Sequence, residues 1–161
     1  MFLMDVNVLV YAHREDTPDH LASREWLESI INGDAAYGYS ELVLSDFLRV
    51  VTHPRVFEMP SALSSAVRFV TQIKESNHAV CLAPGPMHWT VFLQCIEQID
   101  AKGNDIPDAY HAALAMEWNC GWVTTEIYQP CCLRKSVYKK NLMDFIHGLM
   151  YPDTLSAPLL A

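Results

Sequence analysis

The sequence lacks any apolar run near the roughly 20 residues that a membrane-spanning helix needs, which excludes an integral membrane protein. Its first residues lack a basic segment and carry Asp5 within an apolar stretch, so we expect no signal peptide. Basic residues are also scarce: 11 Lys and Arg stand against 19 Asp and Glu, a formal net charge of -8. Electrostatic binding of nucleic acid by the protein surface as a whole is therefore not expected, and any such role must depend on a local basic patch or on bound cations.

Cysteine is present in an odd number, five, with no Cys-x-x-Cys pair. This pattern argues against a disulfide framework and against a zinc ribbon. Free cysteines are typical of a reducing compartment, and we expect a cytoplasmic protein. Apolar residues make up 51% of the chain and charged residues 19%, a composition that supports a compact core rather than disorder.

Short apolar runs alternate with segments of helical periodicity along the chain. Strands are predicted at 2–10, 35–40, 79–83 and 122–125, with helices between them, and a short helix at 141–150. Strands separated by helices pair in parallel through right-handed crossovers. The predicted fold class is therefore α/β, with a central parallel sheet of four or five strands. We expect a single domain over residues 1–150 and a flexible tail over 151–161.

Acidic residues fall at the ends of the predicted strands. Asp5 lies inside the first apolar run, Glu41 follows the second strand, Asp108 opens a helix after Pro107, and Glu126 follows the fourth strand. In an open parallel sheet the carboxyl ends of the strands meet at a crevice where ligands bind. The four acids are therefore predicted to converge although they are far apart in sequence.

Converging carboxylates need a counter-ion, because two like charges about 4 Å apart repel by roughly 4 kcal/mol at an effective dielectric constant of 20. A set of oxygen ligands without His or Cys favours Mg²⁺ or Mn²⁺ over zinc, and the matching chemistry is attack of a metal-activated water on a phosphodiester. Each acid also has a simpler interpretation. Glu41 and Asp108 favour the dipole of the helix that they begin, and Glu126 suits a surface loop.

Several words of this sequence resemble the VapC-type toxins among the PIN-domain nucleases. The resemblance covers residues 2 to about 125 and is carried by Met4-Asp5-Val6-Asn7-Val8-Leu9-Val10-Tyr11-Ala12, by Ser40-Glu41-Leu42-Val43-Leu44-Ser45 with Phe47-Leu48-Arg49-Val50-Val51-Thr52-His53-Pro54-Arg55, by Pro84-Gly85-Pro86 with His88-Trp89, by Gly103-Asn104 through Pro107-Asp108-Ala109-Tyr110, and by Trp122-Val123-Thr124-Thr125.

This resemblance implies an α/β/α sandwich and a Mg²⁺- or Mn²⁺-dependent endoribonuclease, the toxin of a type II toxin–antitoxin pair that cuts tRNA or ribosomal RNA. It implies an antitoxin partner, held in an apolar groove between early helices, and a homodimer. By motif matching, Asp5, Glu41 and Asp108 are expected to be metal ligands with catalytic roles. Asn7 and Thr124 are expected to support the acidic cluster through hydrogen bonds.

The chain departs from the family pattern after the fourth strand. The family reads T-T-D-x-D-F there, whereas this chain reads Thr124-Thr125-Glu126-Ile127-Tyr128. Glu126 takes the place of the fourth acid as a catalytic and metal-binding candidate, and Tyr128 replaces the next Asp. We hypothesise that a frameshift replaced the following segment, so that residues 126–150 are atypical of the family. The alternative function is a catalytically impaired scaffold that binds an antitoxin or RNA without cleaving it.

Other polar residues carry weaker signals. Arg14, Arg49 and Arg55 either contact RNA phosphates or belong to a solvated face. His111 lies three residues after Asp108 and is either a buried partner or a group that faces the crevice. A phosphatase of the haloacid-dehalogenase kind needs D-x-D, and Asn7 occupies the third position of that motif here.

Overall fold

The protein is described by a computed structural model over residues 1–124 and 139–141, and only the backbone is described for the second of these ranges. Five strands form one sheet in the order β3-β2-β1-β4-β5, and every pairing is parallel. The elements in chain order are β1 Phe2–Met4, α1 Val6–His13, α2 His20–Ile31, β2 Tyr37–Tyr39, α3 Glu41–Val51, α4 Leu63–Glu75, β3 Ala79–Cys81, α5 His88–Gln98, α6 Asp105–Glu117, β4 Gly121–Thr124 and β5 Lys139–Asn141.

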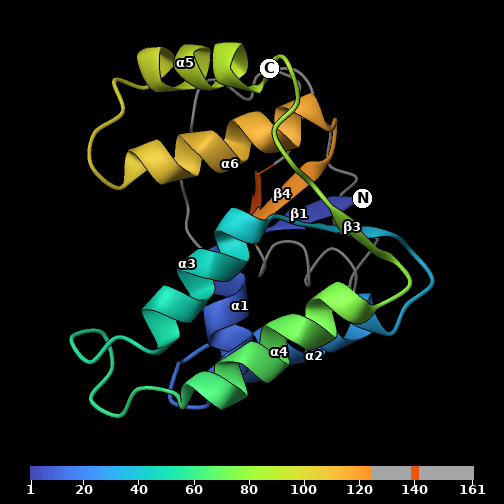
Figure 1. The fold of residues 1–161 in the computed structure, drawn as a ribbon, viewed down its shortest axis with the longest axis vertical. Helices are drawn as coiled ribbons and strands as arrows, with labels where there is room; N and C mark the ends of the chain where they lie inside the picture. The colour runs from blue at the N-terminus through green and yellow to red at the C-terminus, as the bar shows by residue number, and fades with distance from the viewer. Residues whose placement is uncertain (125–138, 142–161) are drawn as a thin grey trace, which may run out of the picture.

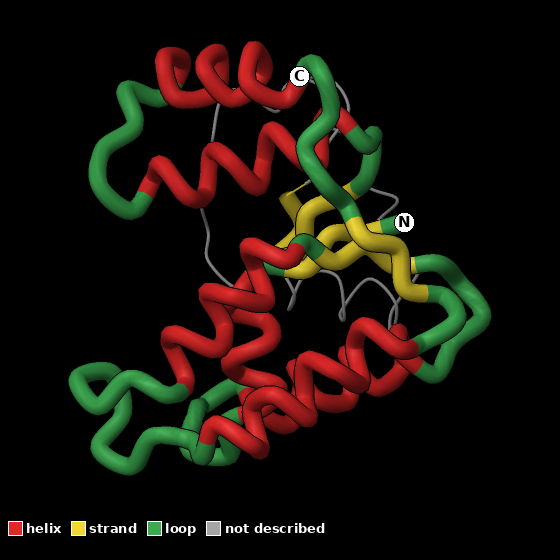
Figure 2. Tube along the Cα trace, in the orientation of Figure 1, coloured by secondary structure: helices red, strands yellow, loops and turns green. Residues whose placement is uncertain are grey.

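The two faces of the sheet are covered by different helices, as Figures 1 and 2 show. Alternate side chains of a strand point to opposite faces. Leu3 and Trp122 therefore pack with residues of α6, whereas Met4 and Val123 join a larger core cluster built from α1 to α4. Helices α5 and α6 pack against each other through their own small cluster. These layers confirm the predicted α/β class and the central parallel sheet.

The prediction of one strand over residues 2–10 is wrong. The strand ends at Met4, and α1 begins at Val6 with Asp5 as its N-cap. Val6, Val8 and Val10 favour strands by their branched side chains, but an aspartate at an N-cap satisfies a free backbone N–H of the first helical turn. Asp5 therefore lies at the end of the strand, where it begins a helix. The predicted helix at 141–150 falls outside the described residues except for Asn141, which belongs to β5.

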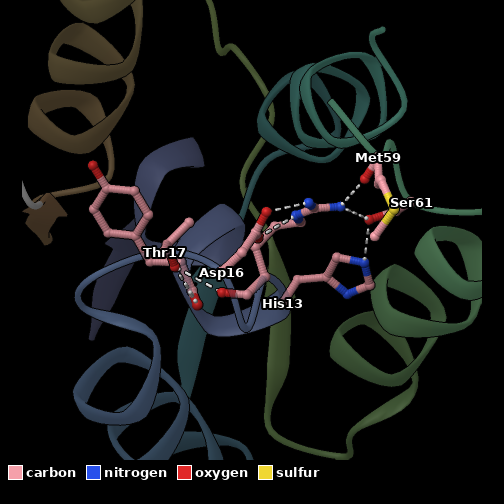
Figure 3. Close-up of polar contacts among 7 residues, drawn as sticks. His13, Asp16, Thr17, Met59 and Ser61 are labelled. Carbon is pink, nitrogen blue, oxygen red and sulfur yellow. Dashed lines mark hydrogen bonds and ion pairs between the residues drawn. The ribbon is translucent and has the colours of Figure 1, made fainter. Parts of the chain in front are cut away.

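A polar cluster at the C-terminal end of α1 holds the loop that joins α3 to α4 (Figure 3). The Arg14 guanidinium donates to Asp16 Oδ1 at 2.8 Å, to the carbonyl of Met59 at 2.9 Å and to Ser61 Oγ at 3.1 Å. It also lies 4.1 Å from the centroid of the Phe57 ring. The Arg14 side chain is only 11% exposed, so its charge is used within the fold.

Replacing Arg14 by Ala is expected to lower the free energy of unfolding by about 2 kcal/mol, because charge-assisted hydrogen bonds and a cation–π contact are lost together. Chemical denaturation of the variant measures this loss. An Arg24→Ala variant is the control, since Arg24 makes an exposed ion pair with Glu28 on one helix, a kind worth less. Equal effects of the two substitutions would contradict the structural role of Arg14.

Within the part of the chain that the structure describes, none of the helices has the length and hydrophobicity of a membrane-spanning segment. The predicted domain end at residue 150 and the predicted tail at 151–161 lie outside the described residues, so this division stays a prediction.

Candidate functional site

Among the acids of the predicted site that the structure describes, Asp5 is the most deeply buried, with an exposed fraction of 3%. Its backbone N–H donates to the carbonyl of Val123 at 2.9 Å, which continues the contact between β1 and β4 by one residue. One carboxylate oxygen accepts from the backbone N–H of Val6 at 2.7 Å, and the other accepts from the Thr124 hydroxyl at 2.6 Å. The carboxylate is therefore fixed in place by the helix that it caps and by the neighbouring strand.

Thr124 donates a hydrogen bond to Asp5, and its supporting role in a metal site stays a prediction. It is 1% exposed and ends β4 beside the end of β1. Asn7, the other predicted supporter, lies half-buried in the first turn of α1, two residues from Asp5. A buried carboxylate needs such hydrogen bonds, because its charge is otherwise too costly to remove from water.

Asp108 lies in the first turn of α6 and is half-buried. Helix α6 leads directly into β4, which is parallel to β1. A helix that precedes a strand in this way runs back along the sheet, so its N-terminal turn lies toward the carboxyl ends of the strands. The topology thus places Asp108 on the same side of the sheet as Asp5.

Glu41 begins α3, directly after its N-cap Ser40, whose hydroxyl oxygen accepts from the backbone N–H of Leu42 at 3.3 Å. The Glu41 side chain is 72% exposed, and its Oε1 accepts from Nζ of Lys74 on α4 at 3.0 Å. This carboxylate raises the pKa of the Lys74 ammonium above its usual value. Glu41 is therefore engaged with α4.

Asp46, on the same helix as Glu41, was not singled out from the sequence. Its side chain is 25% exposed, and Oδ1 accepts from Nε of Arg49 at 3.1 Å. Its negative charge also acts on His111 of α6. Five residues separate Glu41 from Asp46, which turns their side chains by about 140° around the helix axis. Asp46 therefore lies on a different face of α3 from Glu41. This spacing of five residues is the feature of the sequence that could have indicated Asp46 as a second acid of the helix.

His111 is buried among the residues of α6, with an exposed fraction of 2%. Burial is the largest influence on its ring and lowers its pKa to about 4, although the Asp46 carboxylate works in the opposite direction. The ring is therefore neutral at pH 7. Its Nδ1 atom is buried without a hydrogen-bond partner.

The structure does not connect the remaining predicted residues with the acidic site. Arg49 is 66% exposed and pairs with Asp46, and Arg55 is exposed. Arg14 is used within the fold, as described above. Glu126 lies outside the described residues. Within residues 1–124, no three side chains of His, Cys, Asp or Glu form a group close enough to hold a metal ion.

A cavity of about 440 Å³ lies away from these acids, between helices α1, α2 and α4. Its lining combines apolar side chains with a polar rim and consists of Ala12, His13, Arg24, Leu27, Glu28, Ile31, Asn32, Phe69 and Gln72. This cavity lies between early helices, and its use as a groove for an antitoxin stays a prediction.

Comparison with known proteins adds a separate line of support. The family model of the PIN domain matches residues 2–126 of this sequence. A Mycobacterium bovis protein named VapC ribonuclease Mb2897 is 43% identical over 126 residues, which span 78% of this chain and 86% of that protein. Ribonuclease VapC25 of Mycobacterium tuberculosis is 38% identical over 126 residues, with 78% and 89% covered.

Solved structures share the fold at low sequence identity. VapBC2 from Rickettsia felis, bound to a DNA fragment from its promoter, matches with a TM-score of 0.59 and 13% identity, over 86% of this chain and 97% of that one. FitAcB from Neisseria gonorrhoeae matches with a TM-score of 0.55 and 16% identity, over 86% and 97%. The sheet is parallel with acids at its carboxyl edge, the family model matches most of the chain, and the mycobacterial proteins are similar in sequence. Because these observations agree, this chain belongs to the PIN domain family.

Proposed function

We propose that this protein is a cytoplasmic, divalent-metal-dependent endoribonuclease, the toxin of a type II toxin–antitoxin pair. The observation that carries the proposal is the buried Asp5 carboxylate, fixed between α1 and β4 at the edge of the sheet toward which the first turn of α6, with Asp108, also lies. The relatives that match most of the chain are named ribonucleases.

The donor chemistry of the acids fits Mg²⁺ or Mn²⁺. Mg²⁺ is usually bound through one or two carboxylates, with waters and substrate phosphates as its other ligands, so a pair of acids is sufficient. Asp5 and Asp108 are the two residues that we assign to the ion, and Glu126 is the further candidate from beyond the described residues. A bound divalent ion supplies an acidic water at neutral pH and positive charge for the phosphate oxygens.

Neighbouring residues of the chain hold the Asp5 carboxylate in a fixed orientation. The backbone N–H of Val6 and the Thr124 hydroxyl each donate to one oxygen of Asp5, so the carboxylate cannot rotate freely. Burial of Asp5 strengthens its attraction for a cation, because the effective dielectric constant is lower there. Arg49 and Arg55 lie exposed and are proposed to contact RNA phosphates.

The third carboxylate of the proposed site lies on α3, where two residues are candidates. Glu41 is the residue that motif matching assigns, but its carboxylate is held by Lys74. Asp46 is more buried, and its charge reaches His111 on α6, the helix that carries Asp108. We place Asp46 ahead of Glu41, because the Asp46 side chain is 25% exposed whereas the Glu41 side chain is 72% exposed.

Replacing Asp46 by Asn is expected to lower kcat/KM for RNA cleavage about 10-fold or more, whereas Glu41→Gln is expected to change it less than threefold. Cleavage of a defined RNA by the two matched, charge-removing variants measures the difference. A larger loss with Glu41→Gln than with Asp46→Asn would restore Glu41 as the acid of α3.

The proposed partners are an antitoxin and a second copy of the chain. The solved structures that share the fold include the VapBC2 complex and FitAB bound to DNA. The 440 Å³ cavity between α1, α2 and α4 is the proposed place for an antitoxin segment, since its lining combines apolar side chains such as Leu27 and Phe69 with the charged Arg24 and Glu28.

Incubation of the purified protein with total RNA tests the proposed activity. Cleavage is expected with Mg²⁺ or Mn²⁺, and excess EDTA is expected to abolish it by removing the ion. Addition of Mn²⁺ beyond the chelator should restore the activity. Cleavage that persists in EDTA would overturn metal dependence. Absence of cleavage at every metal concentration, together with retained RNA binding, would favour the alternative function as a non-cleaving scaffold.

A further inference from the structure

An acidic site on an acidic protein needs positive charge close by if it is to hold RNA. The chain has a formal net charge of -8, so most of its surface does not attract phosphates. A divalent ion neutralises the carboxylates that bind it, but the neighbouring phosphates of the RNA chain need donors of their own to fix its position. A basic side chain at the carboxyl edge of the sheet meets this need.

Lys74, near the end of α4, brings an ammonium group to this edge. Its Nζ donates to Oε1 of Glu41 at 3.0 Å and lies 5.7 Å from the centroid of the Tyr39 ring. Tyr39 is the last residue of β2, and Glu41 begins α3 two residues later. The ammonium therefore lies at the carboxyl end of β2.

The carboxyl end of β2 lies beside Asp5. Strands β1 and β2 are parallel, with Leu3 opposite Gly38, so Asp5 and Ser40 are level with each other two residues further along. Neighbouring strands of a sheet are about 4.8 Å apart. The Lys74 ammonium and the Asp5 carboxylate therefore belong to adjacent strand ends along the same edge.

The contacts of Lys74 fix its position and leave donors for a ligand. An ammonium carries three N–H donors, and the contact with Glu41 uses one of them. The Lys74 side chain is 41% exposed, so the group is open to solvent. Its partner lies 33 positions away on another helix, so the ion pair holds the ammonium relative to the sheet and not only to its own helix.

We propose that Lys74 is a substrate-binding residue of the acidic site, whose ammonium contacts an RNA phosphate next to the one that is cleaved. This inference rests on the proposed function and gives Glu41 a role other than binding the ion, which is to hold the ammonium at the edge of the sheet. The contact is made equally with the bound substrate and with the transition state, so it acts on binding and not on the chemical step.

Binding of RNA without cleavage tests this contact. The parent protein for the test is Asp5→Asn in Mg²⁺, which is expected to cleave too slowly to interfere, and anisotropy of a fluorescent single-stranded RNA reports its affinity at several salt concentrations. Adding Lys74→Met removes the charge and keeps an unbranched side chain. One phosphate contact to a single strand contributes about 0.7 to the slope of log K against log salt, so the slope should fall by that amount and the affinity at 0.1 M salt by about fivefold. Lys74→Arg keeps the charge and should bind within about twofold of the parent.

Arg68→Met in the same parent is the matched control. Arg68 is exposed on the same helix but lies six residues earlier, which turns it by about 120° around the helix axis from Lys74. Its affinity and salt slope should equal those of the parent, and thermal unfolding should show every variant folded, because exposed ion pairs contribute little to stability. Equal binding by the Lys74→Met and Arg68→Met variants would overturn the proposal, and so would a parent that binds no RNA at low salt.

Cleavage kinetics separate binding from chemistry. With Asp5 restored, Lys74→Met should raise KM for RNA about fivefold and leave kcat within about twofold of the wild type. A fall in kcat at unchanged KM would contradict a role in binding. Absence of cleavage by the wild type, together with RNA binding that still depends on Lys74, would refute only the proposed function.

Discussion

Replacement of Asp5 by Asn is expected to reduce RNA cleavage by about 100-fold or more while the protein stays folded. The substitution keeps the shape of the side chain and one oxygen that accepts from Val6 or Thr124. It removes the negative charge that the proposed cation requires.

Asp100→Asn is the control for this prediction, since Asp100 is 84% exposed and pairs with Lys102 at the surface. Both variants should be purified side by side, assayed for kcat/KM on one RNA in Mg²⁺, and checked by thermal unfolding. Wild-type cleavage by a folded Asp5→Asn variant would remove Asp5 from the mechanism and, with it, the main support for the acidic site.

The strand and helix order was predictable because the apolar patterns are strong. The helix Glu41–Val51 and the strand Tyr37–Tyr39 appear where the periodicity placed them. The first element shows the limit of such patterns. Residues 6–10 contain three valines and read as a strand, yet they form α1 because Asp5 caps the helix and the turn packs against α2 and α3. Local preference for strand was overcome by tertiary packing.

The acidic site was predictable only in part, since sequence order alone does not specify which face of a helix meets a neighbour. Asp5 and Thr124 lie 119 positions apart and form a direct hydrogen bond, as expected for residues at the ends of adjacent parallel strands. On α3, however, the choice between Glu41 and Asp46 depends on where α4 and α6 lie around the helix. Lys74 attracts Glu41 to α4, and this contact has no signature in the sequence.

Arg14 illustrates the same limit for basic residues. A cation near a predicted crevice suggests contact with phosphate, but the structure gives it Asp16, Met59 and Ser61 as partners. Met59 and Ser61 lie on a loop 45 and 47 positions from Arg14 in sequence. Only the fold therefore reveals that the guanidinium already has these hydrogen-bond partners. Its predicted RNA contact stays a prediction.

Lowering the pH from 6.5 to 4 is expected to destabilise the protein through His111 by about 3 kcal/mol, an order-of-magnitude figure from the difference between its pKa in the two states. In the unfolded chain the ring has its ordinary pKa of 6.5, whereas burial lowers the pKa in the folded protein to about 4. Between these values the unfolded state binds a proton that the folded state does not. The free energy of unfolding therefore falls as the pH falls through this window, and the His111 contribution is constant above and below it.

The His111→Leu variant isolates this contribution from that of other groups. Burial also lowers the pKa of His13 and of His88, so these residues add to the destabilisation of both proteins in the same direction. Urea denaturation at several pH values should give a shallower decline for His111→Leu than for the wild type, with the two curves diverging by about 3 kcal/mol between pH 6.5 and 4. Parallel curves would mean that the imidazole is hydrated or protonated in the folded state, and the assignment of a neutral, buried His111 would then be wrong.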